Sequence, residues 1–371
     1  LMDTISSLSS GITNILKDSM GIILIIISYP ILEKKIGLFE IESTLSLYIA
    51  AFICIDFASY WSHRLNHKIN IFWNQHIIHH SSEEFNLACA LRQSVSNIIG
   101  YNALFLIPAA ILGVPSEIII FLSPIHLFGQ FWYHTQHIGK LGFLEYILVT
   151  PSQHRVHHAI NSIYIDKNLS AIFCIWDRIF GTFQEELDDV KPIYGTLKPV
   201  QTWNPIIINF QHFFRLAKDS WHTKKFSDKI KIWFMPTGWR PKDVENLIKY
   251  KSQSKNQEKY YPNYTNLFKL VGVFHFLCVN TILTYFLYNF SDLQIDIKLI
   301  YTLIIFLSVF GYSSLMDKYS WAPFFEVFRS LLSLYLINSI GEITSFKLFL
   351  YIYLFTSITI SFLILKKEES I

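Results

Sequence analysis

The chain has 371 residues, of which 51% are apolar and 16% are charged, and its formal net charge is +3. Its mean hydropathy of +0.33 is too high for an ordinary water-soluble domain, so we expect an integral membrane protein. The small net charge gives no reason to expect nucleic acid or another strongly acidic partner.

Apolar stretches long enough to cross a bilayer come first along the chain. A span needs about 20 mostly apolar residues, and candidates lie at 14–32, 43–62, 97–114 and 117–133. The first candidate has neither the basic start nor the small-residue cleavage site of a removable signal peptide. We therefore expect residues 14–137 to form a first set of membrane helices.

A more polar segment follows. From about 138 to 265 charged residues become denser, and tryptophan, proline and lysine interleave, which is not typical of a segment in hydrocarbon. Beyond it, apolar stretches at 267–290, 296–315, 322–339 and 345–365 predict up to four more membrane helices within 266–366. The predicted fold class is therefore all-α, a polytopic membrane helix bundle with a soluble helical cap at 138–265.

The distribution of basic residues predicts which side of the membrane the cap faces. Ten lysines and arginines lie between 191 and 242, whereas the loop after 290 contains Asp292 and Asp296. Segments rich in lysine and arginine usually remain in the cytosol. We therefore expect the cap on the cytosolic face, of the endoplasmic reticulum in a eukaryote or of the inner membrane in a bacterium.

Histidine is concentrated in three short packages. The first has two histidines four residues apart at the end of the second apolar stretch, and the other two have histidines at positions i, i+3 and i+4. These spacings place the imidazoles of a package on one face of a helix. The packages are His63 and His67; His76, His79 and His80; and His154, His157 and His158.

The predicted topology brings the packages to the same side of the bilayer. The two spans expected between the second and third packages lead across and back, so their crossings cancel. His134 and His137 close the fourth apolar stretch at that level. A single histidine is more often a hydrogen-bonded interfacial side chain, but three packages on one side favour a shared metal centre.

The number of imidazoles indicates two metal ions. A single ion takes about four to six donors, and the predicted ligands are His63, His67, His76, His79, His80, His134, His154, His157 and His158, with His137 as a possible tenth. Imidazole binds iron, zinc, copper and nickel alike. A zinc protease is disfavoured because the pattern His-Glu-x-x-His does not occur.

The remaining histidines are not predicted ligands. His126 lies a little over two turns before His134 and is expected to be structural. His212 and His222 lie among lysine, phenylalanine and tryptophan in the cap, so we expect them at the surface. His275 falls within an apolar stretch and has no partner nearby in the sequence.

The three histidine boxes resemble those of the fatty acid hydroxylase and sterol desaturase superfamily. The flanking residues, including DFASYWSHR at 56–64, TPSQHRVHH at 150–158 and IWDRIFGTF at 175–183, are similar to the alkylglycerol monooxygenase family within it. The similarity is densest from about 56 to 183. Two positions differ from the animal members, because Gln153 stands where a further histidine is expected and His137 where an apolar residue is expected.

The resemblance implies a function and its cofactors. It implies a monooxygenase with two iron ions and tetrahydrobiopterin, in which zinc can replace iron in purified protein. The enzyme would use O2 and an external reductant to hydroxylate the ether-linked carbon of an alkylglycerol lipid that enters from the bilayer. The products would be a fatty aldehyde and a glycerol derivative.

Polar residues beside the histidine packages are candidates for supporting roles. Asp56 lies two helical turns before His63 on the same face and could accept a hydrogen bond from a ligand imidazole, or equally could form a hydrogen bond that packs helices together. The others follow the second and third packages directly and could orient ligands or contact substrate, or could simply cap loops. They are Glu83, Glu84, Asn86, Asp166 and Asn168.

Two alternative functions remain at this point. One is a fatty acyl or sterol hydroxylase or desaturase of the same superfamily that takes electrons from a cytochrome-type donor. The other is a metal transporter without enzymatic activity, whose ligands would be expected at mid-membrane depth rather than at helix ends. The sequence does not indicate an oligomeric state.

Overall fold

The computed structural model describes residues 1–39, 44–250, 259–338 and 345–368. By internal contacts the chain divides into two compact units. The helical-bundle unit comprises residues 1–20, 201–208 and 258–371, and the histidine unit comprises residues 21–200 and 209–257. The predicted boundaries at 138 and 266 separate membrane segments from a water-exposed one. The two compact units are defined by packing instead and do not test these boundaries, which stay a prediction.

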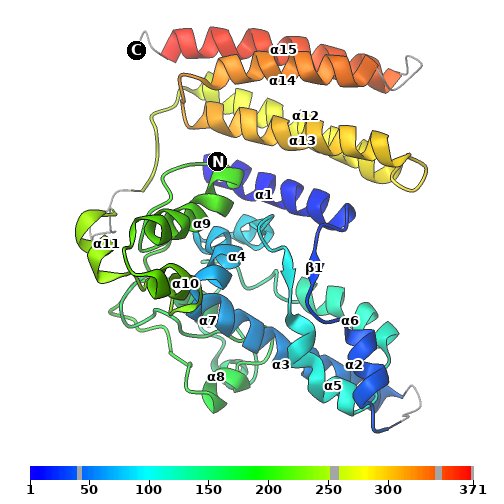
Figure 1. Cartoon of the computed structure of the whole chain (residues 1–371), viewed down its shortest axis with the longest axis vertical. Helices are drawn as coiled ribbons and strands as arrows, with labels where there is room; N and C mark the ends of the chain where they lie inside the picture. The colour runs from blue at the N-terminus through cyan, green and yellow to red at the C-terminus, as the bar shows by residue number, and fades with distance from the viewer. Residues whose placement is uncertain (40–43, 251–258, 339–344, 369–371) are drawn as a thin grey trace. The chain divides into compact units, whose positions relative to one another are not determined.

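The helical-bundle unit contains the predicted C-terminal helices. They are α12 Asn266–Tyr288, α13 Ile295–Met316, α14 Ala322–Asn338 and α15 Ser345–Glu368 (Figure 1). Their bounds lie within a few residues of the predicted ones. Val279, Ile282, Ile305 and Val309 belong to the apolar core that joins them. Of these helices α12, α13 and residues 346–363 of α15 are long and apolar enough to cross a membrane.

The predicted first span at 14–32 is wrong. Helix α1 covers Met2–Ser19 instead, and it packs on α12 and α13 with a face that includes buried serines. Ser6 donates to the backbone oxygen of Trp203, and Ser9 hydrogen bonds with Tyr312. Gly21, with φ of 64°, follows the helix end, and the next residues are mostly β-branched isoleucines, which favour extended backbone.

The apolar part of the histidine unit is built around one long helix. Helix α3, Leu45–Lys68, is the only candidate membrane span among the described residues of this unit. The shorter helices η2 Asn102–Leu106, α5 Ile107–Ile111 and α6 Ser116–Phe128 pack against α3, and α2 Tyr29–Ile36 packs against these three helices. Ala51 and Ile55 of α3 meet Ala109, Ala110 and Val114 in a common core.

The predicted spans at 97–114 and 117–133 are also wrong as full crossings. The apolar helices found there, Asn102–Ile111 and Ser116–Phe128, contain 10 and 13 residues. At 1.5 to 2.0 Å per residue each is about 20 Å long, shorter than the roughly 30 Å of a hydrocarbon core. Gly113, with φ of 68°, and Pro115 interrupt the run. The second and third histidine packages therefore need no pair of crossings between them to reach the same side.

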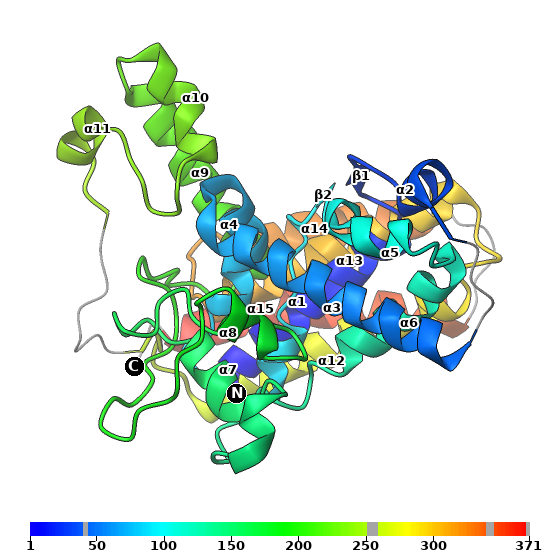
Figure 2. The ribbon, with the colours of Figure 1, turned by 90° about the horizontal axis from the view of Figure 1, so that it is seen from below.

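Short elements carry the rest of the histidine unit (Figure 2). Helix α4, Asn70–His80, begins directly after Ile69, which ends α3. It is followed by η1 Leu87–Leu91, η3 Gly142–Tyr146, α7 Pro151–His157, α8 Ile175–Ile179, α10 Phe226–Phe234 and α11 Lys242–Leu247. Helix α9, Pro205–His222, belongs to the histidine unit from Asn209 onward. The strands in the described residues are β1 Leu24–Ile25 and β2 Ile99–Gly100, which pair in parallel. The predicted all-α class is confirmed.

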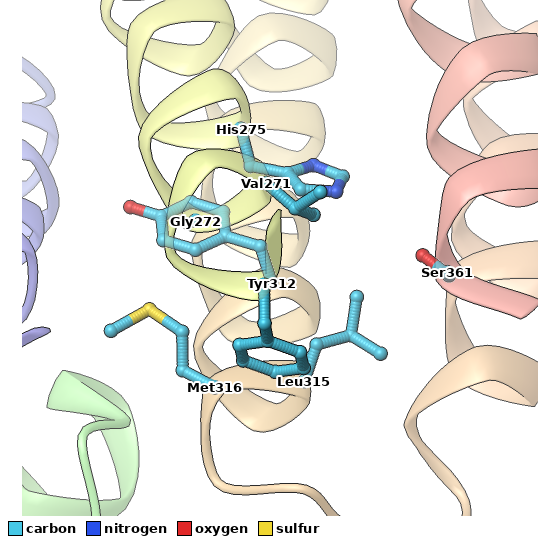
Figure 3. Close-up of a pocket in the computed structure, with 8 residues that line it drawn as sticks. Val271, Gly272, His275, Tyr312, Leu315, Met316 and Ser361 are labelled. Carbon is cyan, nitrogen blue, oxygen red and sulfur yellow. The ribbon is translucent and has the colours of Figure 1, made fainter. Parts of the chain in front are cut away.

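His275 lies inside the helical-bundle unit, where the sequence indicated no partner. Its Nδ1 lies 3.3 Å from the hydroxyl of Tyr353, and its ring is parallel to that of Tyr312, with centroids 6.0 Å apart. Figure 3 shows His275 and Tyr312 beside a cavity of about 10 Å³. This volume suffices for about one water molecule, so we assign His275 a structural role.

Candidate metal centre

The nine predicted ligands form two groups in the histidine unit. His63, His67, His76, His80 and His157 make up the five-histidine group, and His79, His134, His154 and His158 make up the four-histidine group. Within each group, one ring nitrogen from every histidine lies within 4.8 Å of the others. The structure therefore brings every predicted ligand except the optional His137 into one of two groups, each of which could hold a metal ion.

Helices α4 and α7 each contribute to both groups. On α4, His76 and His80 belong to the five-histidine group and His79 to the four-histidine group. The division is reversed around α7, where His157 joins the five-histidine group and His154 and His158 join the other. Positions i and i+4 lie above one another on a helix, whereas i+3 is turned aside. The groups adjoin, since the rings of His80 and His158 stack with centroids 4.4 Å apart.

Distances between ring nitrogens fit coordination to common ions. The Nε2 atoms of His63 and His76 are 2.9 Å apart, those of His134 and His154 are 2.9 Å apart, and those of His154 and His158 are 3.0 Å apart. Consider two ligand atoms that each lie about 2.0 to 2.1 Å from the same ion. When the angle between them at the ion is between a right angle and the tetrahedral angle, the two atoms are about 2.9 to 3.4 Å apart. The Nε2 lone pairs thus converge as ligands to an ion do.

Outward hydrogen bonds fix the orientation of several rings. A carbonyl oxygen can only accept, so a ring Nδ1 facing one carries the hydrogen and leaves Nε2 free to bind a metal. This arrangement holds for His63 with Leu169 at 2.8 Å, His157 with Lys167 at 3.0 Å and His134 with Gln130 at 3.1 Å. These carbonyls act as the supports that metal-bound imidazoles require.

Buried ring nitrogens of the five-histidine group have no protein partner. Among the described residues, Nε2 of His67, His80 and His157 lacks any hydrogen bond. A buried polar atom without a partner costs about 1 to 3 kcal/mol. A metal ion bound by this group would satisfy all three atoms, so the donor set fits the proposed ion.

Burial keeps the imidazoles neutral. It lowers the pKa of the histidines on α4 and around α7 well below 6.5, and neighbouring imidazoles lower the pKa further. Burial also lowers the pKa of His134 to about 4. A neutral imidazole keeps the lone pair that a metal needs, so these histidines are prepared as ligands at neutral pH.

A cavity of about 190 Å³ adjoins the five-histidine group. His67, His80 and His157 form part of its lining. Apolar side chains line it as well, namely Trp73, Ile77, Ile160, Ile165 and Leu197. The cavity therefore offers a small molecule a largely apolar place beside one of the two candidate metal positions.

Comparison with known proteins agrees with this geometry. Residues 48–182 match the fatty acid hydroxylase family model. The chain is 35% identical to alkylglycerol monooxygenase of Xenopus tropicalis over 346 residues, which cover 90% of this chain and 75% of that protein. The chain belongs to the alkylglycerol monooxygenase family.

Two further relatives have the same name. The chain is 33% identical to alkylglycerol monooxygenase of Danio rerio over 348 residues, covering 92% of this chain and 76% of that protein. It is 41% identical to the human protein over 244 residues, covering 65% of this chain and 54% of that protein. The match thus spans about half the length of the human relative. No solved structure matches the chain.

Asp166 is the predicted supporting residue that contacts a ligand. Its Oδ1 lies 3.2 Å from Nδ1 of His67, and its Oδ2 accepts from Lys68 at 2.6 Å. Burial alone would raise the pKa of Asp166, but the hydrogen bonds from His67 and Lys68 lower it to about 2. The backbone of Asp166 has φ of 57°, a conformation that few residues other than glycine adopt. The carboxylate therefore fixes the orientation of the His67 ring in the five-histidine group.

Replacing Asp166 with asparagine should weaken the five-histidine group without unfolding the protein. Removal of a group that orients a metal ligand typically lowers metal affinity about 10- to 100-fold. Titration of the metal-free protein with zinc against a competing chelator would measure this loss for one of the two ions. Lys140→Gln, which removes an exposed charge paired with Glu185, serves as a control. Unchanged affinity for both ions in Asp166→Asn would contradict the role of the carboxylate.

Asp56 has partners other than a ligand imidazole. Its fully buried carboxylate accepts from Nε2 of His126 at 2.7 Å, the amides of Ile172 and Phe173, and Nε1 of Trp176. Contact with one of the nine ligands was therefore the wrong expectation. His126 is structural, as predicted. The interaction fixes residues 172–176 to α3 only a few positions beyond Leu169, whose carbonyl holds His63.

The other predicted polar residues hold backbone in place. Asn168 donates to the carbonyls of Gln153 and Gln184, and Asn86 accepts from the amide of Ala88 at the start of η1. The backbone oxygen of Glu84 accepts from Ser82 and Cys89. A direct part in chemistry stays a prediction for Glu83, Glu84, Asn86 and Asn168.

Four further positions bear on the sequence expectations. His137 is exposed and belongs to neither group, so it is not a tenth ligand. His222 is exposed as predicted, but the prediction for His212 is wrong, because His212 is buried and its Nε2 bonds the carbonyl of Asn70 at 2.9 Å. Gln153 is buried and donates to the carbonyl of Glu145, so it packs the fold behind α7.

Several supports of the ligands gave no signal in the sequence. The carbonyls of Gln130, Lys167 and Leu169 act through the backbone, which any residue supplies. Asp177 accepts from the amide of Leu169 at 2.7 Å and thereby fixes one of these carbonyls. An aspartate at this point of the sequence could have suggested a capping role, but the sequence does not indicate which backbone amide the carboxylate binds.

Proposed function

We propose that this chain is a membrane-bound monooxygenase that hydroxylates the ether-linked carbon of alkylglycerol lipids. The observation that carries the proposal is the pair of histidine groups, with five and four members, in a member of the alkylglycerol monooxygenase family. The helices long and apolar enough for membrane spans fit a lipid substrate that enters from the bilayer.

The two groups would each hold one iron ion. Imidazole is a suitable ligand for iron, and the Irving-Williams order allows zinc to replace iron in purified protein. Bound iron would supply the change in oxidation state that the reaction of O2 with an unactivated C–H bond requires. Tetrahydrobiopterin would be the reductant, as the resemblance to the family implies.

The reaction balances with one lipid, one O2 and two reducing equivalents. One oxygen atom enters the C–H bond of the ether-linked carbon, and the other leaves as water with two electrons and two protons from the reductant. The resulting hemiacetal transfers its hydroxyl proton to the ether oxygen as the carbon–oxygen bond breaks. The products are a fatty aldehyde and a glycerol derivative.

The residues of this chain would position the lipid and exclude water. Trp73, Ile77 and Ile165 supply apolar cavity wall beside the five-histidine group, and a dry wall protects a strong oxidant from side reactions. Asp166 holds His67, and the carbonyls of Lys167 and Leu169 hold His157 and His63. These supports maintain the site while substrate exchanges.

We further propose that the site faces the cytosol. The basic residues between 191 and 242 favour that side, which would be the cytosolic face of the endoplasmic reticulum in a eukaryote or of the inner membrane in a bacterium. Location of His63 and His67 at the end of α3, rather than its middle, favours an interfacial catalytic site over a transport path.

Product analysis tests the proposed reaction. Membranes containing the chain should convert 1-O-hexadecylglycerol to hexadecanal when O2 and reduced pterin are supplied, and should not do so without either. A cytochrome-type donor alone should not support the reaction. Oxidation of a fatty acyl chain or sterol with that donor, and no action on the ether lipid, would instead identify the acyl or sterol enzyme of the superfamily.

A further inference from the structure

The cavity beside the five-histidine group also has a basic part. Lys198 and Arg215 line it together with the apolar residues and histidines already described. Its volume of about 190 Å³ exceeds that of an engineered cavity of about 150 Å³ that admits benzene. The cavity is therefore large enough to admit a small molecule.

One acidic residue near this basic part, Asp219, is already paired. Asp219 forms a two-pronged ion pair with Arg240, at 2.5 and 3.0 Å. The ring of Tyr250 lies between the cations, with its centroid 5.3 Å from Nζ of Lys198, 5.6 Å from the guanidinium carbon of Arg215 and 4.4 Å from that of Arg240. Three positively charged side chains thus lie near the ring of Tyr250, and Asp219 is paired with one of them, Arg240.

The acidic residue in the cavity lining does not change this balance. Asp166 lines the cavity, but its carboxylate is bound by Lys68 and His67. The charges of Lys198 and Arg215 therefore lack a matching carboxylate among the described lining residues. A binding site with this excess suits an anion.

Arg215 also has an unused donor. Its Nη1 is buried and has no hydrogen-bond partner within the described ranges. Burial lowers the pKa of Arg215 and, together with Arg240 and Arg215, that of Lys198. Both cations are thus held at a cost that a bound anion would offset.

We propose that Lys198 and Arg215 bind a phosphate group in this cavity. A guanidinium and an ammonium together match the oxygens of a phosphate. This inference rests on the proposed function, because the phosphate would be the one esterified to the glycerol of an ether lipid. The enzyme would then prefer an alkylglycerol phosphate to the uncharged alkylglycerol, and the phosphate would hold the glycerol while the alkyl chain lies beside the histidines.

Two substrates and one double substitution test the phosphate site. The full-length protein in nanodiscs is given 1-O-hexadecylglycerol or its 3-phosphate, with O2 and reduced pterin. The measured quantity is kcat/KM for the phosphate lipid divided by kcat/KM for the neutral lipid. We expect the double variant Lys198→Gln with Arg215→Gln to lower this ratio by about tenfold or more, because each lost hydrogen bond involves charged groups. Lys218→Gln removes an exposed charge from the same helix, α9, outside the cavity lining, and should leave the ratio unchanged.

Each outcome bears on one of the two proposals. An unchanged ratio in the double variant, with both metal ions retained, would refute the phosphate site while leaving the oxygenase intact. Failure of wild-type protein to oxidise either lipid would refute the proposed function. In that case binding of the phosphate lipid, measured by native mass spectrometry, still decides whether the two cations hold phosphate.

Free phosphate is the other source of the same group. Inorganic phosphate should compete with the 3-phosphate lipid in the wild type, and weakly or not at all in the double variant. If inorganic phosphate bound equally well with and without the lipid present, the site would serve a free anion instead of the substrate's head group. That result would overturn the assignment to the lipid.

Discussion

Replacing His157 with alanine is expected to abolish lipid oxidation and to reduce the bound metal by about one ion per chain. His157 supplies a buried Nε2 without a protein partner, and its Nδ1 is held by the carbonyl of Lys167. Loss of a ligand should exceed the roughly 10- to 100-fold effect of losing a group that merely orients one. Product formation and elemental analysis of the same preparation would measure both effects.

The matched substitution His79→Ala affects the other group. His79 is its only member from α4, so we expect the same loss of activity, with the remaining ion held by the five-histidine group. His222→Ala, at an exposed histidine outside both groups, should retain activity and both ions. Full activity in His79→Ala or His157→Ala would remove that residue from the ligand set.

Replacing Asp56 with alanine should destabilise the histidine unit strongly. The substitution leaves two backbone amides, the indole N–H of Trp176 and the imidazole of His126 without their acceptor in a buried position. Removing one partner of a buried charged network costs about 3 to 5 kcal/mol. The protein should melt at a clearly lower temperature in detergent, as followed by thermal aggregation or intrinsic fluorescence.

A conservative variant and an exposed control complete this experiment. Asp56→Asn keeps an acceptor oxygen and should lose less stability than Asp56→Ala. Asp188→Ala removes a carboxylate that is 97% exposed and should leave the melting temperature unchanged. An equal melting temperature for Asp56→Ala and wild type would contradict the structural role of this carboxylate.

The sequence predicted which histidines come together because their signal was local and redundant. Histidines at spacings of three and four residues must share a helix face, and His134 closes the apolar stretch that precedes the third package. The assignment of each ligand to a group could not be predicted in this way. It depends on how α4 and α7 face one another, which places His79 apart from His76 and His80.

The predicted spans were reliable only where a long apolar run was uninterrupted. Helices α12, α13 and α15 satisfy this condition and agree with the expectation to within a few residues. Helix α14 agrees with the expected bounds but is not among the helices long and apolar enough to cross. Hydropathy alone does not distinguish helix from extended backbone. The predicted span at 14–32 therefore included the isoleucines after Gly21, whereas α1 ends at Ser19 and Leu24 and Ile25 form a strand. In the stretch at 97–133, Gly113 and Pro115 divide an apolar run into helices too short to cross.

Long-range polar contacts were the least predictable part of the site. Asp56 lies two turns from His63 on the same helix, which suggested a bond between them, but α3 contacts α6 and brings His126 to the carboxylate instead. His212 lies in a charged segment yet packs against Asn70 at the start of α4. Such pairs join residues 70 to 142 positions apart, where sequence spacing carries no information.

Metal content tests the central claim most directly. The full-length protein, purified after growth with iron or loaded with iron or zinc, is dialysed and its metal measured by inductively coupled plasma mass spectrometry against protein concentration. The two histidine groups predict two ions per chain in the wild type, with one ion lost in His157→Ala and one in His79→Ala. A wild-type protein that binds at most one ion at saturation, or keeps both ions in these two variants, would contradict a dinuclear centre.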